Sequence, residues 1–275
     1  MCKLLLKEHD IATLRALVEC LGDEVDIQFV DRPDLPPIPI DPMSSKISAQ
    51  NRTAHYLLLA ASIDIGRIVG EAENARRILS IMHSLAGDRL FEEIDENIVI
   101  SWFLNVALNF RLGPDQKKIP YNICRVNRFI RRLDSALYHW GRQYSKPVDI
   151  INGIAKECDL GKPESTRKRV CMFLRWMVRP KPDLHIWDHL SPSDLYLPLD
   201  KNVGVVLYRL GIVGKGALGA LNWNHVRVAT EFAKTIYPED PVKVDYPFFL
   251  LGRWLQGRAS IGSHCEQIAR KFVFL

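Results

Sequence analysis

The stretch that decides the fold is Ser165-Thr-Arg-Lys-Arg-Val-Cys-Met-Phe-Leu-Arg-Trp-Met-Val-Arg179. Its apolar residues recur at three- and four-residue steps, which predicts an amphipathic α-helix. At about 100° per residue, one side of this helix is apolar and should face the core; it carries Val170, Phe173, Leu174, Met177 and Val178. The opposite side is cationic; it carries Lys168, Met172, Arg175 and Arg179, flanked by Arg169 and Trp176. Such a face is typical of the wall of a polyanion-binding cleft, and a solvated basic face is the plainer alternative.

The same helical period continues through most of the chain. It predicts helices over 11–21, 54–66, 71–85, 98–111, 122–144, 148–158, 165–179, 202–210, 223–236 and 247–256. No alternating strand pattern and no internal repeat stands out, so the sequence predicts an all-α fold. Residues 32–42 contain five prolines and should run extended, as a long loop or strap.

Composition narrows the class of protein without naming its function. The 275 residues are 47% hydrophobic and 25% charged, which is ordinary for a globular protein, and the net charge of +5 permits a polyanionic partner without requiring one. The six cysteines are far apart, so we expect reduced, mostly buried thiols. No segment has the length of a signal peptide core or a membrane span, so we expect a cytoplasmic protein that binds no membrane.

Lys168 and Asp200 are the residues with the clearest chemical potential. Asp200 precedes an apolar helical pattern and follows Pro198, so it should be a helix N-cap, held in place and kept ionised by the helix dipole. A lysine beside such a carboxylate could act as the nucleophile of a Schiff-base enzyme. Its amine would have to be neutral, which requires a pKa roughly 2 to 3 pH units below the usual value. We expect burial and the neighbouring Arg167, Arg169 and Arg175 to lower it.

A second arginine-rich face lies on the predicted helix 122–144. Arg128 and Arg131 fall opposite its apolar stripe. A solvated helix surface is the plainer explanation of them, but two separate basic faces make a nucleic-acid partner more favoured than the net charge does. The eight histidines and six cysteines show no ligand spacing, so no metal site is expected, and the glycines of 211–216 mark a loop that ends a helix.

Three stretches together resemble an uncharacterised prokaryotic family distantly related to the helix-hairpin-helix DNA glycosylases. They are Lys168-Arg-Val-Cys-Met-Phe-Leu-Arg-Trp-Met-Val-Arg179, Leu195-Tyr-Leu-Pro-Leu-Asp200 and Asp240-Pro-Val-Lys-Val-Asp-Tyr-Pro-Phe-Phe-Leu-Leu-Gly252. Among characterised relatives, the order lysine, aspartate, late aspartate is most similar to that of the archaeal 8-oxoguanine DNA glycosylases. The resemblance covers about residues 160 to 255.

The resemblance implies a glycosylase-like unit of two helical lobes with a cleft between them. Residues 50–145 would form one lobe, and 146–275 would form the catalytic lobe with 1–49 packed on it. Lys168 would attack C1′ of a damaged nucleotide flipped out of the duplex, and Asp200 would stabilise the sugar cation. The implied lesion pocket contains Asp245, Phe249, Trp176, Trp223 and Tyr246, and the implied DNA-binding residues are Arg169, Arg175, Arg179, Arg128 and Arg131.

The sequence departs from that family in three places. Leu160-Gly-Lys-Pro163 stands where a Leu-Pro-Gly-Val-Gly hairpin would grip phosphate. Cys265 is the only cysteine after Gly252, so no iron–sulfur cluster is expected. Phe249 stands where the archaeal enzymes carry tryptophan.

The sequence therefore predicts a cofactor-free, monomeric DNA glycosylase with AP-lyase activity. Its substrate would be double-stranded DNA containing a damaged purine, either 8-oxoguanine or an alkylated or deaminated adenine. One alternative is a non-catalytic helical protein that binds nucleic acid. Another is an interaction scaffold that uses the proline-rich strap at 33–42.

Overall fold

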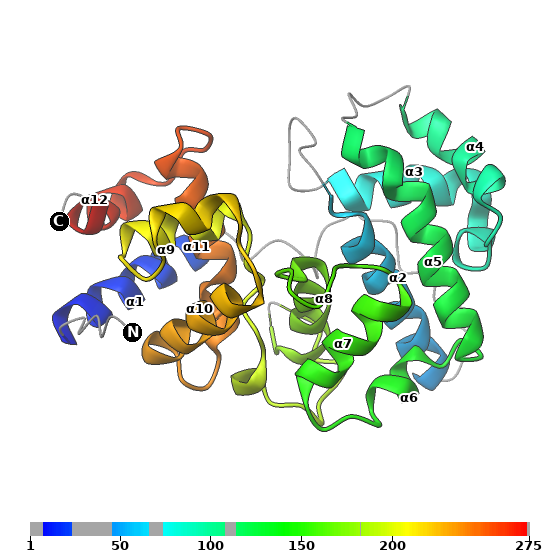
Figure 1. Cartoon of the computed structure of the whole chain (residues 1–275), viewed down its shortest axis with the longest axis horizontal. Helices are drawn as coiled ribbons and strands as arrows, with labels where there is room; N and C mark the ends of the chain where they lie inside the picture. Colours follow the sequence, from blue (N-terminus) through cyan, green and yellow to red (C-terminus); the bar gives the residue numbers. More distant parts are fainter. Residues whose placement is uncertain (1–7, 24–45, 66–73, 108–113, 182, 274–275) are drawn as a thin grey trace.

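The computed structural model describes residues 8–23, 46–65, 74–107, 114–181 and 183–273 (Figure 1). Over these ranges every regular element is a helix, so the all-α prediction is confirmed. The α-helices are α1 (Glu8–Asp23), α2 (Lys46–Ile63), α3 (Asn74–Ala86), α4 (Glu96–Ala107), α5 (Ile119–Arg132), α6 (Leu137–Gly141), α7 (Pro147–Glu157), α8 (Lys168–Val178), α9 (Lys201–Arg209), α10 (Trp223–Ile236), α11 (Asp245–Leu255) and α12 (Ser263–Val273). Short 3₁₀ helices are η1 (Gly87–Phe91), η2 (Pro114–Lys118), η3 (Pro192–Asp194), η4 (Lys215–Gly219) and η5 (Pro241–Val244).

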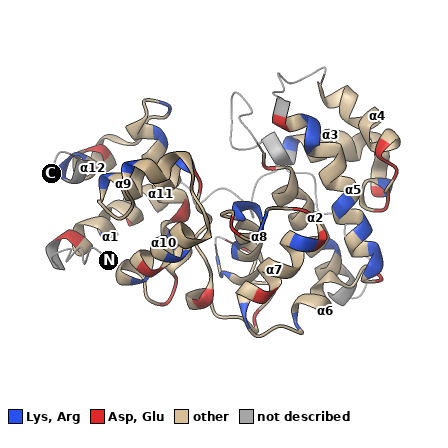
Figure 2. Ribbon diagram, in the orientation of Figure 1, with Lys and Arg blue, Asp and Glu red and all other residues tan. Residues whose placement is uncertain are grey.

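Two buried hydrophobic clusters organise these helices. The first core is built mainly from α2 to α8, and the second core from α1 and α9 to α11 with the start of α12. Figure 1 shows the corresponding two groups of helices, with α8 on the side of its group nearest the other. Lys and Arg are carried by helices of both groups (Figure 2). None of the described helices combines the length and apolar character that a bilayer span requires.

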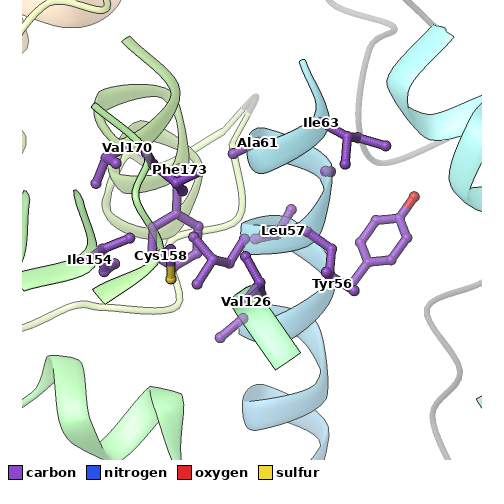
Figure 3. Packing of buried hydrophobic residues seen from close by; sticks show 14 of the residues in the cluster. Tyr56, Leu57, Ala61, Ile63, Val126, Ile154, Cys158, Val170 and Phe173 are labelled. Atoms are coloured by element: carbon purple, nitrogen blue, oxygen red, sulfur yellow. The ribbon is translucent and has the colours of Figure 1, made fainter. Parts of the chain in front are cut away.

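The two cores divide near residue 196. The lobe boundary near residue 145 that the resemblance implies stays a prediction. The division of the cores follows from α7 and α8, which bury their apolar sides against α2. Leu57 and Ala61 of α2 lie toward Ile154 of α7 and Phe173 of α8 (Figure 3). The helix α1 contributes Leu14, Leu17, Val18 and Leu21 to the second core.

The long helix expected over 122–144 is two helices. Asp134 and Ser135 both have positive φ, 49° and 62°, which ends α5 in a left-handed turn before α6 begins. The amide of Ser135 donates to the carbonyl of Ile130 at 3.0 Å and closes this turn. Periodicity missed the break because the apolar stripe continues through it. The helix α12 was not predicted. The expected loop after α9 is confirmed over 211–214, with Gly211 at φ 70°, but Lys215 and Gly216 belong to η4.

The proline-rich strap and the cysteines were the subject of two further expectations. The proline-rich strap at 32–42 lies outside the described residues. The expectation of reduced thiols holds for the buried Cys124, Cys158 and Cys171 and is wrong for Cys20 and Cys265, which form a disulfide. Their Cα atoms are 5.7 Å apart because α1 and α12 pack together across 245 residues of chain, a neighbourhood that spacing alone cannot reveal.

We expect reduction of this disulfide to lower the free energy of unfolding by about 2–5 kcal/mol, because the cross-link restricts the unfolded chain. Urea unfolding with and without a phosphine reductant measures the difference. The double variant Cys20→Ser, Cys265→Ser is the control, and its midpoint should not respond to the reductant. Equal midpoints for the oxidised and reduced wild type would contradict the prediction.

Candidate functional site

Lys168 and Asp200 lie together, as the sequence predicted. Lys168 is the first residue of α8, and its Nζ is 3.5 Å from Oδ2 of Asp200. A second carboxylate, which the sequence did not single out, is closer: Lys168 Nζ donates to Asp64 Oδ2 at 3.1 Å. Asp64 directly follows α2. Because it lies 104 positions before Lys168, nothing in the sequence indicated that the two residues are in contact. The amine therefore lies between carboxylates contributed by two distant segments.

Asp200 is the predicted N-cap of α9. Its Oδ1 accepts from the amides of Asn202 at 2.8 Å and Val203 at 3.0 Å, which leaves Oδ2 directed toward Lys168. The start of α9 is also fixed by α11, because a Cβ at Gly252 would lie 2.1 Å from the carbonyl oxygen of Asn202. Only glycine allows this approach, so the cap and the helix contact together position the carboxylate.

The pKa of Lys168 is raised, whereas the sequence led us to expect a lowered one. Burial does lower it, but the charges of Asp64 and Asp200 raise it further, and the net result is a pKa above the usual lysine value. The arginines expected to lower it do not control it. In this resting arrangement Lys168 is an ammonium ion, and nucleophilic attack first requires loss of a proton.

The cationic side of α8 faces the second core. Along this side, Lys168, Arg175 and Arg179 are each paired with a carboxylate from beyond the core boundary. The partners are Asp200, Asp245 and Asp240 respectively. We call these three pairs the α8 seam. Arg175 and Arg179 follow Lys168 by seven and eleven residues, which are about two and three turns of an α-helix. The three cations therefore lie on one side of α8.

The pair of Arg175 and Asp245 is the most enclosed of the three in the α8 seam. Its Nη1 bonds Asp245 Oδ2, and its Nε is 3.4 Å from Asp183 Oδ2. The exposed side-chain fractions of Arg175, Asp245 and Asp183 are 12%, 9% and 1%. Burial raises the pKa of Asp245 to about 6, although Arg175 and Lys168 act to lower it. Asp245, predicted to recognise a lesion, is thus bound to Arg175.

The predicted DNA-binding arginines need correction. Arg175 is paired as described, and Arg179 Nε bonds Asp240 Oδ2 at 2.6 Å, so neither presents a free charge to DNA. The Nη1 of Arg169 donates to the carbonyl of Ser62 at 2.9 Å. On α5, Arg128 donates to the carbonyl of Ile94 and to Glu96 Oε1. The exposed Arg131 donates to the carbonyl of Glu92, a neutral group that does not cancel its charge. The second basic face is therefore partly neutralised.

The aromatic residues predicted for a lesion pocket lie in three different environments. Trp176 is 5% exposed and belongs to the first core. Trp223 is half-buried; its ring is 5.0 Å from that of Tyr196 and 5.0 Å from the Arg167 guanidinium. Tyr246 and Phe249 are half-buried on α11, with ring centroids 6.0 Å apart. Trp176 therefore packs as a core residue, together with the apolar residues of α8.

A pocket of about 430 Å³ opens beside Lys168, on the side of Asp64. It is lined by Asp64, Ile65, Leu160, Gly161, Ser165, Thr166, Arg167, Lys168 and Arg169. None of the five predicted lesion-pocket residues is among them. The loop between α7 and α8 supplies most of the lining, and over the described ranges no three His, Cys, Asp or Glu side chains are grouped to hold a metal.

The family of the chain follows from a match that covers most of it. A family model described as a protein of unknown function, DUF2400, matches residues 42–253. The chain belongs to this family. The matched stretch includes Lys168, Asp200, Asp245 and Asp64, and it leaves out the two cysteines of the disulfide. No curated protein and no solved structure matches the chain.

Proposed function

We propose that this protein is a DNA glycosylase with AP-lyase activity that excises a damaged purine. The observation that carries the proposal is the distance of 3.5 Å between Lys168 Nζ and Asp200 Oδ2 at the edge of an open pocket. A lysine nucleophile needs a fixed carboxylate beside it and space for the reacting sugar. The N-cap bonds of Asp200 and the glycine contact at α11 meet the first need, and the pocket meets the second.

The reaction would begin with transfer of a proton from the Lys168 ammonium to one of the two carboxylates in reach. The neutral Nζ then bonds C1′ while the bond from C1′ to the base breaks, and the base leaves with that electron pair and takes up a proton. Asp200 would stabilise the positive charge that develops on the sugar. Ring opening would give an imine, and loss of a C2′ proton with departure of the 3′ phosphate would cleave the strand.

The proposal assigns the helices to the parts of a helix-hairpin-helix glycosylase. In this proposal the two cores correspond to its two lobes, and the site lies where α8 meets the second core. The segment from α7 through its loop to α8 corresponds to the hairpin unit, with Arg167 at φ 47° just before the catalytic lysine. The substrate would be double-stranded DNA, bound by one copy of the protein.

The contact with DNA must use cations other than those of the α8 seam. Lys162, on the loop that borders the pocket, is exposed, as are Arg131 and Arg132 on α5. Arg132 pairs with Glu157 at the surface, where solvent and salt weaken such pairs. Phosphates could therefore compete for these groups more readily than for Arg175.

A second candidate function is favoured by the raised pKa of Lys168. An ammonium held between Asp64 and Asp200 can be a structural ion pair in a protein that binds nucleic acid without cleaving it. Such a protein would bind with strong salt dependence and release no base.

Incubation with a panel of duplexes, each holding one damaged purine or an abasic site, tests the two candidates. A glycosylase with lyase activity should nick its substrate without alkali and give a covalent complex when borohydride is present. Base release that is revealed only by alkali would show a glycosylase without lyase activity. Salt-dependent binding with no base release on any duplex would support the non-catalytic alternative.

A further inference from the structure

Asp64 is attached to a helix end that is held by side chains from three other elements. The last carbonyls of an α-helix have no partners within the helix. The carbonyl of Ser62 accepts from Asn122 Nδ2 and from Arg169 Nη1, each at 2.9 Å, and the carbonyl of Ile65 accepts from Gln116 Nε2 at 2.8 Å. Asn122 and Gln116 are 4% and 1% exposed, so these bonds form in the protein interior.

This arrangement fixes the turn that carries Asp64. The bonds to Ser62 and Ile65 hold the backbone on both sides of it, and they come from α5, α8 and η2. The carboxylate is 36% exposed and lines the pocket, yet its Oδ2 is 3.1 Å from Lys168 Nζ. Asp64 thus combines a rigid attachment with access to the same space as the amine.

We propose that Asp64 is a positioning residue that holds the Lys168 amine at the pocket, on the side opposite the second core. A role for Asp64 in catalysis rests on the proposed function, but its contact with Lys168 can be tested without DNA. Asp200 holds the amine from the second core and Asp64 holds it from the first. Removing Asp64 would leave Nζ with the more distant carboxylate.

The charges around Lys168 predict how the amine should respond. The charged groups around the amine are Asp64 after α2, Asp200 before α9, Asp245 at the start of α11, and Arg167, Arg169 and Arg175 on or beside its own helix. The three carboxylates act to raise its pKa. Asp64 contributes the largest raising effect on the pKa of Lys168. Without it, burial opposes only Asp200 and Asp245, so the pKa should fall.

The variant Asp64→Asn tests this by removing the charge and keeping the shape. Loss of one close opposite charge lowers a lysine pKa by roughly one to three pH units, so the neutral fraction at a fixed pH should rise about tenfold or more. Trace acetylation with acetic anhydride near pH 9, read for Lys168 by mass spectrometry, measures that fraction. The rate should rise by this factor in Asp64→Asn.

Two further variants separate the effect of charge from a change of access. Asp64→Glu restores a carboxylate and should return the rate toward that of the wild type. Asp188→Asn removes a carboxylate that pairs with Arg142 at the surface of the same group of helices, and it should leave the rate unchanged. An unchanged rate in Asp64→Asn, or no return in Asp64→Glu, would overturn the proposal.

Borohydride trapping of the same variants on abasic DNA separates this inference from the proposed function. If the wild type traps, Asp64→Asn should shift the trapping profile to lower pH and reduce its maximum. If no protein traps but acetylation follows the prediction, the function is wrong and the role of Asp64 in holding Lys168 stands. Normal trapping with unchanged acetylation would remove Asp64 from the site.

Discussion

Lys168→Ala should abolish the borohydride-trapped complex with abasic DNA and lower strand cleavage by about 10³-fold or more. The reason is that the trapped species is the reduced imine of this amine, and loss of a covalent nucleophile costs a factor of that order or larger. The neighbouring carboxylates cannot replace the amine, because neither forms an imine. Gel separation of the trapped complex and single-turnover cleavage measure the two effects.

The control for this variant is Lys156→Ala, which removes an exposed lysine from α7 and leaves the pocket intact. It should trap as the wild type does. Lys168→Ala also leaves Asp64 and Asp200 facing each other without a cation, so thermal unfolding must show that the variant is folded. Equal trapping by a folded Lys168→Ala would show that another group forms the imine.

Arg175→Met should lower the free energy of unfolding by about 3–5 kcal/mol. Breaking a buried ion pair by removing one partner leaves an uncompensated buried charge. Here the carboxylates of Asp245 and Asp183 would both lose the guanidinium, and they are 9% and 1% exposed. Methionine fills a similar volume, so the loss reports the charge and its hydrogen bonds more than a cavity. Urea unfolding near pH 7 measures it.

The surface pair between Arg142 and Asp188 provides a matched control. Its side chains are 37% and 63% exposed, so Arg142→Met should cost no more than about 1 kcal/mol. A cost below about 1 kcal/mol for Arg175→Met as well would show that the α8 seam contributes little to stability. Arg175→Met should also raise the pKa of Asp245 further above about 6, because Arg175 is the main group that lowers it.

Much of the secondary structure could be read from periodicity, and its failures have local causes. The apolar spacing of α8 and α10 predicts both helices well, because each has one side buried in a core. The break between α5 and α6 depends on the backbone of Asp134 and Ser135, which apolar spacing does not report. The disulfide between Cys20 and Cys265 depends on a contact between the two ends of the described chain.

The sequence indicated two of the three charged residues at the candidate site, Lys168 and Asp200, and it did not indicate Asp64. Asp200 could be recognised because a helix N-cap is a local signal, and Lys168 could be recognised because it lies on the side of α8 opposite the apolar stripe. Asp64 gave no such signal. It follows α2 without a motif, and its role arises from a contact with a residue 104 positions later.

Interactions within a few residues produce the all-α class, the two sides of α8 and the cap of α9, so the amino-acid pattern is enough to predict them. What the cationic side of α8 meets depends on packing between distant segments. Helical periodicity places Lys168, Arg175 and Arg179 on one side, but it cannot show whether solvent, phosphate or carboxylate lies opposite. The second core supplies the carboxylates of the α8 seam through long-range packing. The same packing raises the pKa of Lys168, because carboxylates a few ångströms away outweigh the effect of burial.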